Sequence, residues 1–232
     1  MCGVLEGYAR DAASRRAARA AVERSEFAHP LFTPGKRVID LSCGPGFLTV
    51  ALEGPAPSKV DYLVAAPAAL PFPSASVDVA FSHALPERLA DPGPLLAELH
   101  RILRPGGRLA LSTLDWSRAR LRPKTANVDA ALRGYYLLLR RAGGNPFAGR
   151  RIAEHVAAAG FTAVTARTRY RTDLPYRDLA AYVERRLATA LADPTHPDRD
   201  QLTSAARSAW SWTRSAGPGD FTQCWTELIA TR

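Results

Sequence analysis

The segment that most constrains the fold of this chain is an apolar run that leads into a glycine turn. Residues 37–42 read Arg-Val-Ile-Asp-Leu-Ser, a pattern typical of a parallel strand that helices cover on both faces. Cys43-Gly44-Pro45-Gly46 follows, and residues 47–52 have a helical pattern. Glycines let a ligand approach the backbone, and the free N–H groups of a helix N-terminus point at the same place. The sequence therefore predicts an α/β domain with a small-molecule site beyond this strand.

Strand and helix patterns alternate along the remainder of the 232 residues. Helices are expected over 9–25, 47–53, 94–103, 127–142, 150–159, 176–192 and 199–214. Strands are expected over 37–42, 60–64, 77–81, 108–113, 161–169 and 221–231. Gly143-Gly144 and Gly160 stand where two of these helices should end. The length and the alternation favour one α/β domain spanning residues 1–232.

Composition excludes several classes of protein. The net charge is +9, but only three of the 31 basic residues are lysines, and the arginines are scattered instead of gathered beside a nucleic-acid reading element. An acidic partner or an anionic substrate remains compatible with this charge. No apolar run is long enough to span a bilayer, no secretory signal is evident, and three widely spaced cysteines suggest neither disulfides nor a metal cluster. We therefore expect a cytoplasmic protein that binds no membrane, nucleic acid or metal.

Three motifs occur in a characteristic order. They are the glycine turn at 38–46, a Leu-Pro-Phe-Pro turn at 70–73, and a helix stop with Arg-Pro-Gly-Gly at 103–109. Together they resemble the class I S-adenosylmethionine (SAM)-dependent methyltransferases, in particular the small-molecule group related to ubiquinone/menaquinone methyltransferases, most closely over residues 28–115. The resemblance implies a Rossmann-like fold with a mostly parallel sheet. It also implies that 221–231 is a last, antiparallel strand near one edge.

The resemblance divides the domain and places a cofactor. It implies an N-terminal helical segment (1–33), a nucleotide-binding half (34–115), a helical lid (116–160), and C-terminal strands and helices (161–232). SAM would lie against the glycine turn, and its contacts would be Asp40, Ser42, Gly44 and Gly46.

The nucleotide-binding half is shorter than this family requires. Asp40 and Asp78, which mark two successive secure strands, are 38 positions apart. One βαβ unit needs about 30 residues, and the resemblance calls for two further strands and two helices in this interval. Pro67, Pro71 and Pro73 prevent a second helix there. We therefore predict six strands in the sheet instead of seven, with the loss between residues 47 and 77.

The same interval lacks the acids expected to bind the nucleoside. A ribose-binding carboxylate is expected about 20 residues after the glycine turn, at the end of the second strand. Asp61 is the only acid between Glu53 and Asp78, and it lies near the start of its strand. The resemblance places the adenine-contacting acid just before the Leu-Pro-Phe turn, where this chain has Ala66. The expectation is a weak or vestigial cofactor site and no cofactor, with SAM as the alternative.

Polar side chains follow two later strands and are candidates for chemistry. His83 and Glu87 follow the strand at 77–81, and Asp115 follows the strand at 108–113. Ligands of such folds bind beyond the carboxyl ends of the strands. His83 and Asp115 are therefore candidate catalytic residues and Glu87 a candidate substrate contact, although both His83 and Asp115 could instead cap the turns that follow them.

Aromatic residues after the last of these strands suggest a lid over an apolar substrate. Trp116 and Phe147 are candidate substrate contacts, and Tyr135 and Tyr136 are candidate catalytic residues. Helical spacing alone also predicts that such residues form the core face of the helix at 127–142. Both readings stay open at this point.

Three functions are compatible with these observations. The first is an enzyme of natural-product biosynthesis that has lost methyl transfer and catalyses a cyclisation or pericyclic-type reaction on a largely apolar substrate, possible because confinement of a flexible substrate can itself lower a barrier. The second is a SAM-dependent small-molecule methyltransferase with a shortened cofactor site. The third is a non-catalytic partner subunit of a methyltransferase. An acidic carrier protein is a further expected partner, because it could present the substrate to a basic chain.

Overall fold

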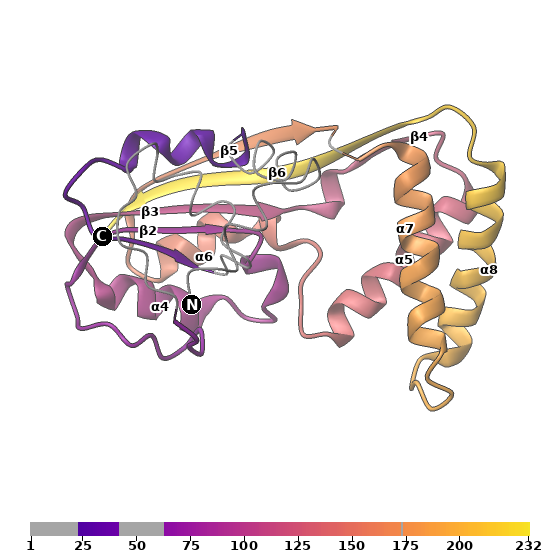
Figure 1. The fold of residues 1–232 in the computed structure, drawn as a ribbon, viewed down its shortest axis with the longest axis horizontal. Coiled ribbons are helices and arrows are strands. Elements are labelled where there is room, and N and C mark those ends of the chain that lie inside the picture. Colours follow the sequence, from indigo (N-terminus) through magenta and orange to yellow (C-terminus); the bar gives the residue numbers. More distant parts are fainter. Residues whose placement is uncertain (1–22, 42–62, 173) are drawn as a thin grey trace, which may run out of the picture.

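The structure is a computed structural model that describes residues 23–41, 63–172 and 174–232 (Figure 1). The strands are β1 (Val38–Leu41), β2 (Val77–His83), β3 (Leu103–Leu114), β4 (Arg120–Arg122), β5 (Thr162–Arg171) and β6 (Asp220–Thr231). The helices are α4 (Gly93–Ile102), α5 (Ala126–Arg141), α6 (Ile152–Ala158), α7 (Tyr176–Leu191) and α8 (Arg199–Ser215). Short 3₁₀ turns are η1 (Glu26–Leu31), η2 (Pro86–Arg88), η3 (Trp116–Arg118) and η4 (Ala148–Arg150).

The sheet is built around an antiparallel β6. Strands β1, β2 and β3 pair in that order and run parallel. β6 pairs antiparallel with β3 on one edge and with β5 on the other, so β5 runs in the same direction as β3. The predicted α/β fold, with a mostly parallel sheet and a last antiparallel strand near one edge, is therefore confirmed.

The described sheet has six strands, as predicted, but its membership differs from the prediction. Residues 63 and 64 of the expected strand at 60–64 are not in a strand, and the other three lie outside the described residues. β4, which was not predicted, pairs antiparallel with the first residues of β6. Three residues are too few for a period-2 pattern to be recognised, so β4 is defined by its partner strand and not by its own sequence.

Helices cover the sheet on one face and the N-terminal segment covers the other. α4 and α6 pack their apolar sides on β2, β3 and β6 in one buried cluster that includes Leu95, Leu99, Leu111 and Val156. On the opposite face, Phe27 and Leu31 of η1 pack on Phe81 in a smaller cluster. The expected helices at 9–25 and 47–53 lie almost entirely outside the described residues, as do Ser42, Gly44 and Gly46.

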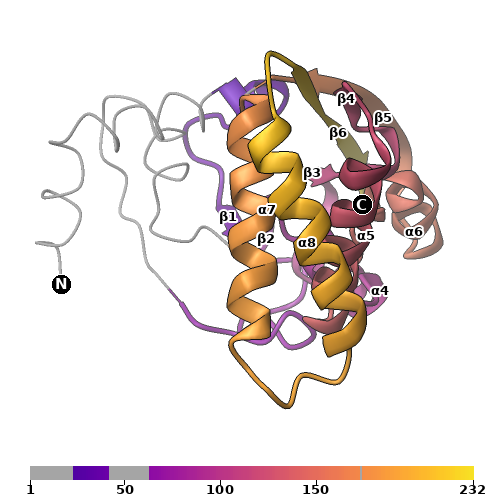
Figure 2. The same ribbon diagram turned by 90° about the vertical axis from the view of Figure 1, so that its right-hand side faces the viewer.

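A bundle of three helices stands beyond one end of the sheet (Figure 1). α5, α7 and α8 pack side by side and share a separate apolar core (Figure 2). The predicted bounds of these helices are confirmed to within one residue at each end, because their core faces follow the 3.6-residue period. α5 and α8 approach closely at Gly134, where a Cβ would lie 2.3 Å from the Cβ of Ala205. In the described residues no helix combines the length and apolarity needed to cross a bilayer.

Two glycines end helices as predicted. Gly143 follows α5 with φ +81° and Gly160 follows α6 with φ +93°, the left-handed region in which glycine has no steric cost.

Candidate functional site

The carboxyl ends of β1, β2 and β3 meet at one edge of the sheet, which is the candidate site. Asp40 is the third residue of β1, and His83 is the last residue of β2. The hydroxyl of Ser82 donates to the carbonyl of Leu41 at 3.3 Å, which ties the ends of β1 and β2 together. Asp115 follows the end of β3 directly. Parallel pairing therefore brings these three polar positions to the same edge.

His83 is a neutral, largely desolvated imidazole. Its ring stacks on Trp225 of β6 with centroids 4.6 Å apart, and its buried Nδ1 has no hydrogen-bond partner among the described residues. Burial, together with the weaker effect of the positive charges of Arg24, Arg171 and Arg88, lowers the pKa of His83 to about 3. At neutral pH this side chain can exchange one hydrogen bond with a substrate atom but carries no charge.

The depressed pKa of His83 predicts an acid-dependent loss of stability. The unfolded chain takes up a proton at His83 near pH 6.5, whereas the folded chain does so only near pH 3, so acid favours unfolding throughout this window. We expect the free energy of unfolding of the wild type, relative to His83→Gln, to fall by about 2 kcal/mol between pH 7 and pH 5. Urea unfolding of both proteins at several pH values measures this difference.

The comparison with His83→Gln also removes the contribution of Glu87. Burial raises the pKa of Glu87, which has the opposite sign and favours the folded state in acid. Both proteins carry Glu87, so its effect cancels in the difference. A difference between the two proteins that stays constant from pH 7 to pH 5 would show that His83 is not desolvated.

Asp115 is fully buried and caps the turn that follows it. Its Oδ1 accepts hydrogen bonds from the backbone N–H of Ser117 at 2.9 Å and from the Ser117 hydroxyl at 2.5 Å. Its Oδ2 accepts no hydrogen bond from the part of the chain that the structure describes, and it lies 3.7 Å from Nε of Arg118. Gly149 packs directly against it, because a Cβ at Gly149 would lie 2.7 Å from the Cβ of Asp115. The structure therefore gives Asp115 a capping role and leaves one carboxylate oxygen without a hydrogen bond.

His83 and Asp115 lie on opposite faces of the sheet. Gly149, against which Asp115 packs, also contacts Thr226, whereas His83 stacks on Trp225. Neighbouring residues of a strand point to opposite faces. The two candidate catalytic residues thus share an edge of the sheet but belong to different surroundings.

Glu87 lies on the Asp115 side of the sheet. The hydroxyl of Thr113 donates to its carboxylate at 2.7 Å, and its backbone carbonyl accepts from the N–H of Asn145 at 2.8 Å. Thr113 pairs with Thr226 in the sheet and points to the same face. Half-buried Glu87 and buried Asp115 therefore lie on the same side of the sheet, next to the loop that follows α5.

The four candidate lid aromatics gather in the core of the helical bundle. Trp116 contacts Tyr135 and Tyr136 with ring centroids 5.6 and 5.7 Å apart, and Tyr136 contacts Phe147 at 5.3 Å. Trp116 and Tyr135 are buried, and Tyr136 and Phe147 pack against the same core from its rim. Burial is the main cause that raises the pKa of both Tyr135 and Tyr136, so both phenols stay protonated at neutral pH. The structure brings these residues together as packing partners.

Residues on β5 and β6 that sequence reasoning missed surround His83. Glu227 is buried on the same face of β6 as Trp225. Its carboxylate lies 2.8 Å from Arg167, 3.2 Å from Arg171 and 3.9 Å from Arg169. A glutamate within a largely apolar strand and the alternating Arg167, Arg169 and Arg171 in the second half of β5 are visible in the sequence. They could have indicated this network.

The stretch that leads into β2 supplies no carboxylate for a nucleoside. Residues 63–76 contain no acidic side chain, and Ala66, at the position of the expected adenine contact, is exposed. Among the described residues Asp40 is the one predicted cofactor contact that can be placed. In the described stretch 63–76, therefore, no carboxylate is available to the nucleoside part of SAM. They also contain no group of three or more His, Cys, Asp or Glu residues able to hold a metal ion.

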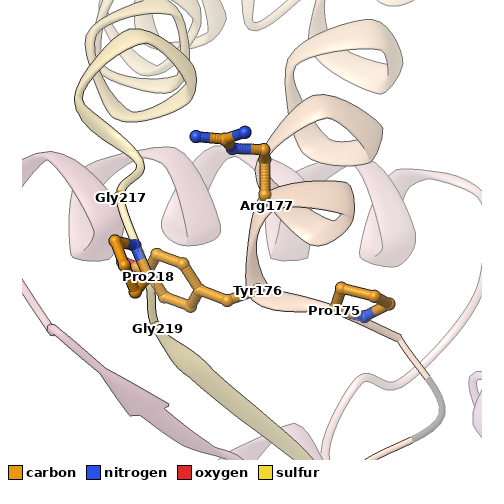
Figure 3. A pocket seen from close by; sticks show the side chains of 6 residues that line it. All are labelled: Pro175, Tyr176, Arg177, Gly217, Pro218 and Gly219. Carbon is orange, nitrogen blue, oxygen red and sulfur yellow. The ribbon is translucent and has the colours of Figure 1, made fainter.

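A hollow lies where the bundle joins the sheet (Figure 3). It measures about 350 Å³ and is lined by Pro175, Tyr176, Arg177 and residues 217–219. The Tyr176 hydroxyl donates to the carbonyl of Pro123 at 2.6 Å, and Arg177 donates twice to the carbonyl of Ala216. These bonds tie the start of α7 to the segment after β4 and to the segment after α8. The hollow is therefore part of a structural joint between the bundle and the sheet.

Comparisons with known proteins agree with this fold. A family model described as a methyltransferase domain matches residues 21–111. A Bacillus halodurans protein assigned as a methyltransferase superposes with a TM-score of 0.56 at 13% identity, over 91% of this chain and 97% of that chain. Phosphoethanolamine N-methyltransferase 2 of Haemonchus contortus superposes with a TM-score of 0.53 at 18% identity, over 92% of this chain and 53% of that chain. Residues 21–111 thus match a methyltransferase domain, and the fold of the described residues is similar to that of solved methyltransferases.

Similarity to curated relatives is confined to part of the chain. A malonyl-[acyl-carrier protein] O-methyltransferase of Serratia marcescens is 40% identical over 80 residues, which cover 34% of this chain and 31% of the relative. The chain thus spans about a third of the length of the curated relatives it matches.

Proposed function

We propose that this protein is an enzyme of natural-product biosynthesis that acts without SAM. The proposed reaction is a cyclisation or pericyclic-type reaction on a largely apolar small molecule, bound at the carboxyl edge of the sheet. The observation that carries this proposal is the acid-free stretch at 63–76, which enters β2 directly beside β1. A bound nucleoside would leave its ribose and adenine groups without the carboxylate partners that this family supplies, at about 1–3 kcal/mol for each lost hydrogen bond.

The surroundings of His83 support this chemistry. A neutral imidazole that stacks on Trp225, with a ring nitrogen that no described residue hydrogen-bonds, can donate a hydrogen bond to a substrate carbonyl without transferring a proton. Restricting a flexible substrate to a reactive conformation lowers the barrier by a mechanism that needs little acid–base equipment. Trp116, Phe147 and Glu87 remain the proposed substrate contacts, and Asp115, Tyr135 and Tyr136 remain further candidates for catalysis.

SAM-dependent methyl transfer to a small molecule is the second candidate. The match of residues 21–111 to a methyltransferase domain, and the Serratia marcescens relative, favour it. Asp40, Ser42, Gly44 and Gly46 would then hold the cofactor.

Calorimetric titration with SAM separates the two candidates. We expect a dissociation constant above about 100 µM, or no binding, because two lost hydrogen bonds weaken affinity by roughly 10²–10⁴. Gly46→Ala, which closes the glycine turn to a ligand, should leave any heat signal unchanged. Binding at low micromolar concentration that Gly46→Ala abolishes would overturn the proposal in favour of methyl transfer.

We further propose that an acidic carrier protein presents the substrate. The net charge of +9 makes an acidic protein an electrostatically favoured partner.

A further inference from the structure

One face of α8 carries a large aromatic side chain that is exposed instead of packed in the core. Trp210 is 53% exposed, whereas Trp212 on the same helix is 2% exposed and contacts Tyr176. Beside Trp210 lies an open hollow of about 540 Å³, lined by Ala206, Arg207, Trp210 and Ser211. Exposed tryptophans beside a hollow are typical of binding surfaces rather than of solvated helices.

Arginines flank this tryptophan on both sides. Arg207 and Arg214 lie three residues before and four residues after Trp210, so all three share one face of the helix. The guanidinium of Arg214 lies over the Trp210 ring, 3.9 Å from its centroid, and is 3.7 Å from the carboxylate of Glu184 on α7. Arg207, Trp210 and Arg214 form what we call the α8 stripe. The contact with Arg214 orients the Trp210 ring before a partner binds, which reduces the entropy lost on binding.

We propose that the α8 stripe docks the acidic carrier protein. An apolar side chain of the carrier would enter the hollow beside Trp210, and carboxylates on either side of it would meet Arg207 and Arg214. This inference rests on one part of the proposed function, namely that a carrier protein presents the substrate, and not on the proposed reaction. α8 lies at the side of the bundle away from the sheet (Figure 1), and Arg207, Trp210 and Arg214 are exposed, so a partner reaches the stripe without displacing another described element.

The charges of the stripe disfavour two other occupants. Two copies meeting about a twofold axis at Trp210 would bring Arg207 of one copy near Arg214 of the other, which costs energy through like-charge repulsion. Duplex DNA needs an extended row of phosphate contacts, whereas here two guanidiniums flank one indole and a hollow. A compact acidic surface with one protruding apolar side chain fits this pattern best.

Titration of the full chain with a purified acyl carrier protein, bearing its phosphopantetheine, tests the proposal. We expect Trp210→Ala and Arg207→Glu each to weaken the dissociation constant by at least about 10-fold, and Trp210→Phe to restore most of the affinity. Arg151→Glu, at the residue just before α6, makes the same change in net charge away from the stripe and should have little effect. Added salt should weaken binding of the wild type.

Four results would overturn the proposal. They are no binding of the carrier, equal effects of Arg151→Glu and Arg207→Glu, self-association that Trp210→Ala removes in sedimentation, and tighter binding of a DNA duplex than of the carrier. The assay uses neither SAM nor turnover, so its failure is distinct from a failure of the proposed reaction.

Discussion

Replacing Trp212 with alanine should lower the free energy of unfolding by about 3–5 kcal/mol, the usual cost of truncating a buried tryptophan. Trp212 is a central member of the core shared by α5, α7 and α8, and its ring lies 5.6 Å from that of Tyr176. Tyr176 in turn closes the joint to β4 through its hydrogen bond to Pro123. The cavity left by the indole would therefore loosen both the bundle and its attachment to the sheet. Urea denaturation followed by circular dichroism measures the loss.

Trp210 provides the matched control for this experiment. The same truncation two residues earlier removes an exposed side chain and should change the free energy of unfolding by no more than about 0.5 kcal/mol. If the two variants are equally unstable, the orientation of α8 described here is wrong. The same measurement shows that the carrier-binding assay with Trp210→Ala uses a folded protein.

Replacing Glu227 with glutamine should destabilise the protein by about 2–3 kcal/mol. Removing one partner of a buried ion pair costs about 3–5 kcal/mol. The cost is lower here because Arg167 and Arg169 are half exposed and can be hydrated, whereas Arg171 is only 12% exposed. Glutamine keeps the shape of the side chain, so the change isolates the charge. Urea denaturation at neutral pH gives the difference.

Glu26→Gln is the control for the Glu227 variant. Glu26 makes an exposed ion pair with Arg169 and should contribute no more than about 1 kcal/mol. If Glu227→Gln lowers the free energy of unfolding no more than Glu26→Gln does, the ion pairs between Glu227 and the arginines of β5 do not stabilise the fold. Because Arg171 also lowers the pKa of His83, Glu227 links the stability of β5 and β6 to the electrostatics of the candidate site.

The helices and the order of the main strands could be predicted because their signals are local. The bounds of α5, α7 and α8 follow from apolar residues that recur at the helical period and from glycines such as Gly143 at their ends. The antiparallel β6 came from the resemblance to a family and not from its own pattern, which would suit a strand of either direction.

The candidate site was predicted only as an edge of the sheet. His83 ends β2, Glu87 comes shortly after β2, and Asp115 directly follows β3, as chain order requires. Which face each one occupies depends on pairing with β6, whose residues lie more than 100 positions later in the chain. The sequence pattern could not supply that register, so the separation of His83 from Asp115 was missed.

The sequence by itself determined the α/β class, the helix bounds and the lack of acids before β2, because each depends on the identity of neighbouring residues. Only the tertiary structure decided that Trp116 and Tyr135 pack inside the bundle, and that Trp210 is exposed while Trp212 is buried. The physical reason is that burial depends on which surface another element covers. α7 and α5 cover one side of α8, and no residue within α8 specifies that arrangement by itself.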